Sequence, residues 1–330
     1  MRRRSATPLS WHTVYQRKVN IAAESLHLLP AAAPATRRAR RLASRAAFLA
    51  ALLLAPSLLL LAMFTYLPIL RVAARSLLEQ QLDGPARWGL GNFTRLLADP
   101  HFAAVAWNSV AYTLGTVIPS LVLALAFALA LAGNGRLVAL LRMAVALPLL
   151  IPLVAAAAIF AFILLPGGGL FDTWFARFGL ADANWLGDPS LALPSLIVLS
   201  VWKNTGYYML FFLAGLAGIP QELHEAASLD GAGAWTRLRR ITLPLLGPTT
   251  AFLLPVAVVN AVTQVDHVVL LTHGGPGDST NLLLYYIYQQ AEQNNDNGLA
   301  AAATVIGIGC LMALASISLR SLERGIHYES

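Results

Sequence analysis

The fold of this chain is decided by residues 219–248, which read IPQELHEAASLDGAGAWTRLRRITLPLLGP. This polar, charged stretch lies between two long apolar runs and has the composition of a helix-turn-helix. Pro220 suits the first position of a helix, because its missing N–H has no helical partner to lose there. Asp230-Gly231 then ends the helix, since Gly231 accommodates the left-handed conformation that a C-terminal cap needs. We therefore predict two short helices that reverse direction at Gly231, the second of which ends at Pro244 and Pro248.

The composition around this stretch is that of a membrane protein. The 330 residues are 57% hydrophobic and 12% charged, whereas soluble domains average about 25% charged residues. Each apolar run reaches the roughly 20 residues that a helix needs to cross the hydrocarbon core, and each must be helical to pair its backbone. The runs cover residues 46–70, 108–132, 139–165, 194–218, 247–271 and 299–319. We predict an all-α membrane protein with six transmembrane helices.

Prolines and small residues add detail to these spans. Pro148 and Pro152 in the third span and Pro255 in the fifth predict kinks or a broken helix. Two stripes of small residues, Ala124/Ala128/Ala132 and Ala303/Gly307, let helices approach closely. We favour packing within one subunit over a subunit interface for each stripe.

The distribution of positive charge predicts the orientation. A cytoplasmic N-terminus assigns 17 Lys and Arg residues to the cytoplasm and five to the outside, with Lys203 inside a span. This asymmetry satisfies the positive-inside rule and places both termini in the cytoplasm. Residues 1–45 hold ten of these cations and one acid, Glu24. We interpret them as a disordered cytoplasmic arm attracted to anionic lipid, with a nucleic-acid-binding arm and an early start codon as alternatives. We expect residues 46–325 to form the six-helix transmembrane domain and residues 326–330 to form a cytoplasmic tail.

The loop sequence resembles the "EAA" loop of permease subunits of bacterial ATP-binding-cassette (ABC) importers. The motifs that carry the resemblance are Glu225-Ala226-Ala227, Asp230-Gly231-Ala232 and Ile241-Thr242-Leu243-Pro244. The flanks look most like the subunits of sugar and glycerol-3-phosphate importers. These flanking motifs are Trp202-Lys203-Asn204, Phe211-Phe212-Leu213-Ala214-Gly215-Leu216, Gly274-Gly275-Pro276 and the ending Leu322-Glu323-Arg324-Gly325-Ile326-His327-Tyr328. The resemblance covers roughly residues 46 to 328. It implies that residues 46–325 form a six-helix permease domain arranged like that of a type I ABC importer.

The resemblance implies a multi-subunit assembly in the bacterial cytoplasmic (inner) membrane. This chain would pair with a homologous permease subunit, two cytoplasmic ATP-binding-cassette ATPases and an extracytoplasmic solute-binding protein, within membrane lipid and without nucleic acid. The loop would dock into a cleft on an ATPase, which uses the ATP and magnesium, so that this chain needs no cofactor or metal. The residues carried over to this coupling role are Glu225, Ala226, Ala227, Asp230, Gly231, Ala232, Ile241, Leu243 and Pro244.

The sequence offers no catalytic constellation of its own. Its two lysines are Lys18 and Lys203, neither of which follows a glycine, so the chain has no P-loop for nucleotide. His224-Glu225 lacks the second histidine of an HExxH metal site. The single cysteine, Cys310, sits in an apolar run and is predicted to be a small core residue. An enzyme is therefore the third class of function that we consider, after an ABC importer permease and a secondary transporter that works alone.

Polar residues inside the fourth and fifth spans predict the solute path. Ionisable and amide groups are costly in a membrane and usually line a cavity or pair with one another. Asn260 and Gln264 share a helical face, which His267 extends at i+7. The candidate path residues are Trp202, Lys203, Asn204, Tyr208, Asn260, Gln264 and Asp266.

Each path residue also has a structural interpretation, as a group near the membrane surface or one satisfied by its neighbours. The solute is a sugar, an oligosaccharide, a polyol or glycerol-3-phosphate, among which the sequence does not choose. The alternative is a stand-alone secondary transporter of a small polar solute, which an inverted repeat or coupling-ion carboxylates in broken helices would support.

Overall fold

The computed structural model describes residues 51–81, 84–175 and 183–325. The predicted arm at 1–45 and tail at 326–330 lie outside these ranges, as do residues 46–50 of the first span. Internal contacts group the chain into two units, Met1–Pro68 and Ile69–Ser330. The described part of the first unit is helical throughout and includes the π-helix η1 (Ala62–Tyr66).

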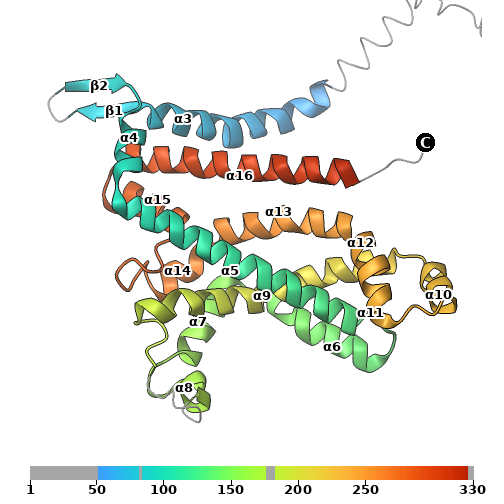
Figure 1. Ribbon diagram of the computed structural model, residues 1–330. Coiled ribbons are helices and arrows are strands. Elements are labelled where there is room, and N and C mark those ends of the chain that lie inside the picture. Colours follow the sequence, from blue (N-terminus) through green and yellow to red (C-terminus); the bar gives the residue numbers. More distant parts are fainter. Residues whose placement is uncertain (1–50, 82–83, 176–182, 326–330) are drawn as a thin grey trace, which may run out of the picture. The chain divides into compact units, whose positions relative to one another are not determined.

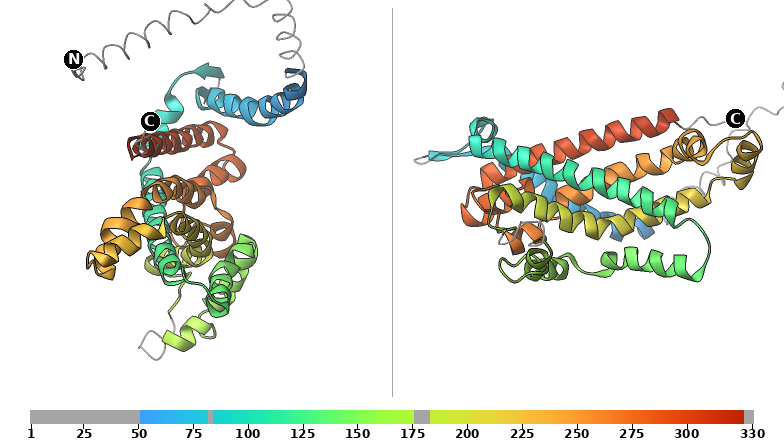
Figure 2. Two further views of the ribbon diagram at one scale, coloured as in Figure 1. Left: turned by 90° about the vertical axis from the view of Figure 1, so that its right-hand side faces the viewer. Right: turned by 60° about the horizontal axis from the view of Figure 1, so that its bottom comes forward.

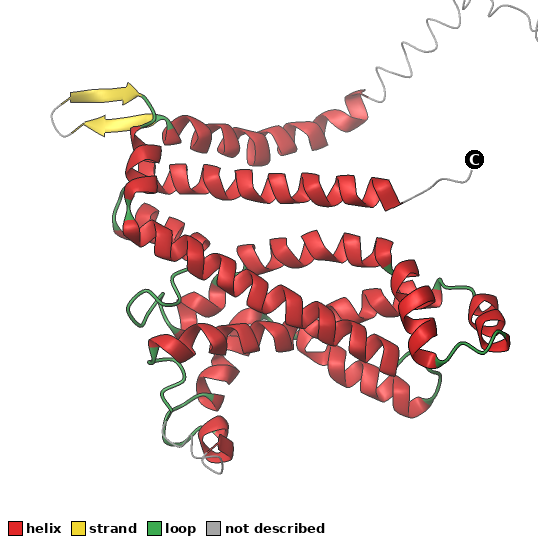
Figure 3. Cartoon of the chain, in the orientation of Figure 1, coloured by secondary structure: helices red, strands yellow, loops and turns green. Residues whose placement is uncertain are grey.

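The described chain is helical apart from one antiparallel hairpin, formed by β1 (Leu78–Gln81) and β2 (Gly84–Trp88) (Figures 1 and 3). Five helical segments are long and apolar enough to span a membrane: Ala51–Ser76, which ends in α3 (Leu67–Ser76), α5 (Pro100–Ala130), α9 (Pro189–Ala217), α13 (Gly247–Thr263) with α14 (Asp266–Leu271), and α16 (Asn297–Gly325), apolar over Asn297–Ser318. A sixth span is a bent pair made of α6 (Arg136–Ala146) with η2 (Leu147–Leu150), followed by α7 (Leu153–Ile163). The predicted all-α fold with six spans is confirmed if the bent pair counts as one span.

Shorter elements connect these spans. They are α4 (Gly91–Ala98), α8 (Leu170–Phe175), α15 (Leu283–Tyr288) and the π-helix η5 (Gln289–Gln293). The chain also turns at Gly135 and at Gly231, where the backbone φ angle is positive.

Two spans begin earlier than their apolar runs because an Asp-Pro pair caps each of them. Asp99 accepts a hydrogen bond from the His101 N–H at 2.9 Å, and Pro100 occupies the first turn of α5. Asp188 accepts from the Ser190 N–H at 2.7 Å, and Pro189 occupies the first turn of α9. Hydrogen bonds from Ser190 also hold the pKa of the Asp188 carboxyl below its usual value. Hydropathy misses these starts, whereas the cap residues identify them.

The predicted break in the third span is confirmed at its prolines. The axes of α6–η2 and α7 differ by 101°. Pro148 lies in the 3₁₀ turn η2, and Pro152 is the N-cap of α7, so neither contributes an amide donor to the bend.

Of the kink or break predicted at Pro255, the break is wrong, because α13 continues through Pro255 and the fifth span breaks at Gln264–Val265 instead. A proline at 255 deprives the Ala251 carbonyl of its intrahelical donor. Ser318 on α16 supplies the missing hydrogen bond, with its Oγ 3.1 Å from that carbonyl oxygen. The neighbouring helix therefore lets α13 tolerate the proline.

Small residues pack helices within this chain, as the sequence analysis favoured. Ala124 and Ala128 are fully buried in the core cluster shared by α5 and α9, whereas Ala132 is exposed. Ala303 is also fully buried, and a Cβ at Gly307 would lie 3.0 Å from Leu283 Cδ2 on α15. Both stripes thus meet elements of the same subunit.

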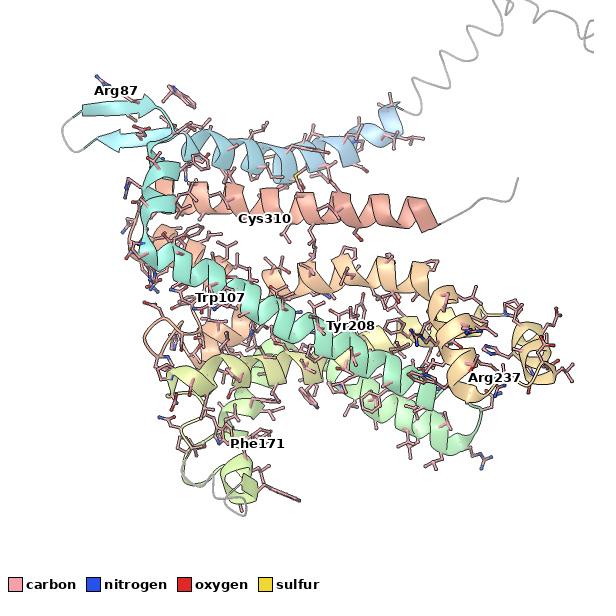
Figure 4. All side chains as sticks on the ribbon, viewed as in Figure 1. Arg87, Trp107, Phe171, Tyr208, Arg237 and Cys310 are labelled. Carbon is pink, nitrogen blue, oxygen red and sulfur yellow. The ribbon has the colours of Figure 1, made fainter. Side chains whose placement is uncertain are left out.

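Cys310 is exposed on α16, so its predicted place in the core is wrong (Figure 4). It borders an apolar groove of about 330 Å³ between α5, α13 and α16. An apolar stretch of sequence does not imply burial in a membrane protein, because lipid is as apolar as a protein core.

The contact between Ser318 and Ala251 makes a stability prediction. We expect Ser318→Ala to lower the free energy of unfolding by about 0.5–1 kcal/mol, since it leaves a carbonyl unpaired. In a Pro255→Ala background the same substitution is expected to cost less, because the new backbone N–H at position 255 can then donate to Ala251. Thermal unfolding of the purified protein in detergent measures both values.

Ser316→Ala is the matched control, because the Ser316 hydroxyl donates to the Met312 carbonyl of its own helix at 2.8 Å. An equal cost of Ser318→Ala in both backgrounds would contradict the role given to this hydroxyl.

Candidate functional site

The loop at 219–248 forms the predicted pair of short helices between α9 and α13 (Figure 1). The first is α10 (Gln221–Leu229); α11 (Ala234–Arg237), the π-helix η4 (Leu238–Thr242) and α12 (Leu243–Leu245) follow as the second. Pro220 is the N-cap of α10 rather than its first helical residue, one position from the prediction. We call residues 219–248 the coupling loop from here on, after the role that the resemblance implies.

The reversal at Gly231 is confirmed, and its geometry is that of a Schellman cap. Gly231 has a φ of +78°. The Ala232 N–H donates to the Ala227 carbonyl at 2.9 Å, and the Gly231 N–H donates to the Ser228 carbonyl at 3.1 Å. A Cβ at Gly231 would meet no described atom within 4 Å. The requirement for glycine therefore comes from the backbone conformation and not from crowding.

The coupling loop leaves large side chains uncovered. Every residue of α10 is exposed or half-buried, including Glu225, Ala226 and Ala227. Leu229 is 89% exposed and Trp235 is 71% exposed. Such an apolar surface next to charged residues is typical of a protein-docking site.

The remaining coupling residues of the prediction follow the same pattern. Glu225 accepts a hydrogen bond from Gln221 Nε2 at 2.9 Å, one turn earlier on its own helix. Asp230, Leu243 and Pro244 are exposed, whereas Ala232 and Ile241 are half-buried. The buried residues of the loop are Thr242, whose Oγ1 lies 3.4 Å from the Arg237 carbonyl oxygen, and Leu246, which belongs to the core cluster.

Positive charge collects at the end of the unit that carries the coupling loop. Arg237 projects from α11, and the N-terminal end of α6, with Arg136, lies at the same end (Figures 2 and 4). The C-terminal end of α16 lies there too, while α8, α14 and α15 lie at the opposite end (Figure 1). The unit is thus polarised along the direction of its spans.

Among the predicted path residues, the structure brings Tyr208 and Asn260 together. Asn260 Nδ2 donates to the Tyr208 hydroxyl at 3.4 Å, which joins α9 to α13. Gln264 follows one turn later, at the break between α13 and α14. Its Oε1 is buried and has no hydrogen-bond partner among the described residues. A polar oxygen of this kind is available to a ligand hydroxyl.

His267 leaves the face that it was predicted to share with Asn260. The break at Gln264–Val265 interrupts the helical phase, so the i+7 spacing no longer applies. His267 is fully buried, and its Nε2 lies 2.8 Å from the hydroxyl of Tyr112. That hydroxyl is also 2.6 Å from Ser200 Oγ. Asp266, next to His267, is exposed.

Tyr112 and Ser200 were missed by the sequence analysis. A single tyrosine or serine in an apolar span gives no clear signal, because a serine can satisfy its hydroxyl within its own helix and a tyrosine can pack as an apolar ring. The buried network joins α5, α9 and α14 across large separations in the chain.

Lys203 and Trp202 lie against the third span rather than against Asn260. The Lys203 ammonium is 2.5 Å from the Ile151 carbonyl oxygen and 3.3 Å from that of Pro148. Trp202 is 37% exposed and lines an apolar groove of about 640 Å³. The centroid of its ring lies 5.4 Å from that of Phe160. Asn204 is buried. The structure therefore does not bring the seven predicted path residues together. Trp202 and Lys203 face the third span, whereas Tyr208 and Asn260 join α9 to α13, one turn before the break in the fifth span.

Comparisons with known proteins agree with this architecture. A family model described as "Binding-protein-dependent transport system inner membrane component" matches residues 120–328. A solved structure of a bacterial ABC transporter involved in the import of the acidic polysaccharide alginate has a chain with the same fold. Its TM-score is 0.76 at 23% sequence identity, and the match covers 87% of this chain and 99% of that one.

Curated relatives match over most of their length. The sulfoquinovosyl glycerol transport system permease protein SmoG of Agrobacterium fabrum is 34% identical over 278 residues, which cover 83% of this chain and 90% of that protein. The trehalose/maltose permease MalF of Thermococcus litoralis is 33% identical, over 75% of this chain and 86% of its own. The sn-glycerol-3-phosphate permease UgpA of Brucella abortus is 32% identical, over 84% and 95%. The chain therefore belongs to the binding-protein-dependent transport system inner membrane component family, the membrane-spanning permeases of ABC importers.

Proposed function

We propose that this chain forms half of the translocation path of an ATP-driven importer for a sugar or a related polyhydroxylated solute in the bacterial inner membrane. The observation that carries the proposal is the coupling loop, whose two short helices reverse at Gly231 and leave Leu229 and Trp235 uncovered. A homologous permease would supply the other half of the path.

The coupling loop would transmit the work of two cytoplasmic ATPase subunits. ATP and magnesium would belong to those subunits, and this chain would bind no cofactor. Closure of the ATPases would move α10 and α11, and with them the ends of α9 and α13, which flank the loop. That movement would switch the path between its inward-facing and outward-facing forms.

The names of the relatives support a hydroxyl-rich solute. These relatives are named as permeases for sulfoquinovosyl glycerol, trehalose or maltose, and sn-glycerol-3-phosphate, each of which carries at least two hydroxyl groups. Asn260, Gln264 and the Tyr208 hydroxyl offer donors and acceptors that match such groups. An extracytoplasmic binding protein would deliver the solute; the alginate transporter has been solved in complex with its pentasaccharide-bound periplasmic protein.

A secondary transporter working alone is the other class. Asp266 is the only acidic residue in the six apolar runs of the sequence, and it is exposed. A coupling-ion site needs carboxylates or carbonyls that converge on an ion. The exposed coupling loop favours coupling to an ATPase.

The orientation follows from the cations at the end that carries the coupling loop. We expect reporter fusions after Arg136, in the coupling loop and after Arg324 to report cytoplasm, and fusions near Asp99 and Asn295 to report the outside. Fusion activity in whole cells measures this. A coupling loop on the outside would contradict the proposal as a whole.

Gly231 makes a prediction about coupling. Gly231→Val is expected to cost roughly 1 kcal/mol or more at its left-handed φ, and so to tilt α10 against α11. Uptake and retention of the ATPase during purification are both expected to fall, while membrane insertion is unchanged.

Gly231→Asn is the matched control, because asparagine tolerates the left-handed conformation and a Cβ meets no described atom there. It should retain most of the uptake. Normal ATPase retention in Gly231→Val would show that the coupling loop does not dock the ATPase.

The polar residues at the break of the fifth span make a prediction about the solute. Asn260→Ala and Gln264→Ala are each expected to slow uptake by about fivefold, the loss of roughly one hydrogen bond. Radiolabelled maltose and sn-glycerol-3-phosphate serve as probes in proteoliposomes that hold the complete importer. Thr263→Val is the control on the same turn, since its hydroxyl donates to the Val259 carbonyl of its own helix at 2.7 Å. Equal rates in all three variants would place the path elsewhere.

A further inference from the structure

The third span bends where its backbone has lost hydrogen-bond donors. Pro152 has no N–H, so the Pro148 carbonyl cannot receive a bond from it and accepts the Ile151 N–H at 3.2 Å instead. The Ile151 carbonyl lies between η2 and α7, outside both helices. An unpaired carbonyl is costly within a bilayer, because no water is present to replace the lost donor. We call residues 147–153 the elbow.

Lys203 supplies the donor that the Ile151 carbonyl lacks, and it adds a second donor to the Pro148 carbonyl. It lies in the middle of α9 and is 8% exposed. Its Nζ is 2.5 Å from the Ile151 carbonyl oxygen and 3.3 Å from the Pro148 carbonyl oxygen. An ammonium has three N–H donors, so the elbow uses two of them.

The neighbours of Lys203 on α9 hold the two arms of the bend. A Cβ at Gly206 would lie 2.2 Å from the Val145 carbonyl oxygen, so α9 and α6 meet backbone to backbone there. Trp202 packs against Phe160 on α7, with ring centroids 5.4 Å apart. One short stretch of α9 therefore contacts α6, the elbow and α7.

The position of α7 bears on the polar path. α7 packs against α14, and Leu271 at the end of α14 contacts the apolar cluster around Leu153 and Phe160. α14 begins two residues after Gln264, at the break of the fifth span. A shift of the elbow would thus move α7, then α14, and then the break that carries Gln264.

We propose that Lys203 is a positioning residue for transport, whose ammonium fixes the elbow and thereby sets α7 and α14 beside the polar path. Its charge serves backbone carbonyls of this chain rather than an anionic group on the solute. The effect on transport rests on the proposed function, whereas the hydrogen bonds that Lys203 makes to the elbow do not.

Hydrogen exchange of the complete importer in lipid nanodiscs tests the elbow. In Lys203→Met we expect amides of residues 147–157 to exchange about tenfold faster than in the wild type, because the Ile151 carbonyl loses its donor and the Pro148 carbonyl loses one of its two donors. Lys203→Arg keeps a charged donor and is expected to restore slow exchange. Unchanged exchange in Lys203→Met would overturn the proposal.

Arg142→Met is the matched control. Arg142 also donates to two backbone carbonyls, those of Leu131 and Gly133, both at 2.7 Å. Its loss should speed exchange around residues 131–142 and leave the elbow unchanged.

If Lys203→Met fails to assemble, Gly206→Ala takes its place, because its methyl group would press on Val145 and loosen the same amides. Unchanged exchange in that variant would overturn the proposal as well.

Uptake of two probes separates positioning from solute contact. With a positioning role, Lys203→Met slows uptake of neutral maltose and of anionic sn-glycerol-3-phosphate by the same factor, and Lys203→Arg restores whichever probe the wild type transports. Slower uptake of the anion alone would overturn the proposal in favour of a solute-binding lysine. If the wild type takes up neither probe, that result speaks against the proposed solute class, and the exchange measurement alone decides the role of Lys203.

Discussion

The structure depends on the constraint that backbone carbonyls within hydrocarbon need a donor. At three places where a proline or a helix end removes that donor, a side chain from elsewhere in the unit replaces it. Ser318 donates to the Ala251 carbonyl, four residues before Pro255, and Lys203 donates to the Ile151 carbonyl in the elbow of the third span. Arg142 does the same for Leu131 where α5 ends. These side chains decide which irregularities the spans can sustain, and their removal leaves an unpaired carbonyl in each case.

The irregularities lie beside the polar residues that we propose for the solute path. A continuous helix pairs its own backbone and presents side chains along fixed faces, so it cannot redirect a polar group. The break at Gln264–Val265 frees a buried oxygen of Gln264 and turns His267 toward Tyr112. The bend of the third span brings α7 against α14, beside that break. Two broken spans therefore meet close to the polar residues that we assign to the solute path.

The coupling loop satisfies the opposite requirement, because it must keep its shape with little help from packing. Local interactions hold it: the Schellman cap at Gly231 and the hydrogen bond from Gln221 to Glu225. Its apolar side chains, among them Leu229 and Trp235, remain uncovered. A loop that is ordered by its own caps and exposes apolar groups can dock a partner at a low cost in conformational entropy. This is the property that coupling to a separate ATPase demands.

The sequence by itself determined the six apolar runs, the helix pair of the coupling loop and its reversal at Gly231, since each depends on residues within a few positions of one another. The Asp-Pro starts of α5 and α9 were equally local and could have been predicted from their cap residues. Only the tertiary structure decided that α13 continues through Pro255, that Cys310 is exposed, and that Lys203 faces the third span. The reason is that Ser318, the groove beside Cys310 and the Ile151 carbonyl are supplied by segments distant in sequence, and no local pattern encodes which of them will meet.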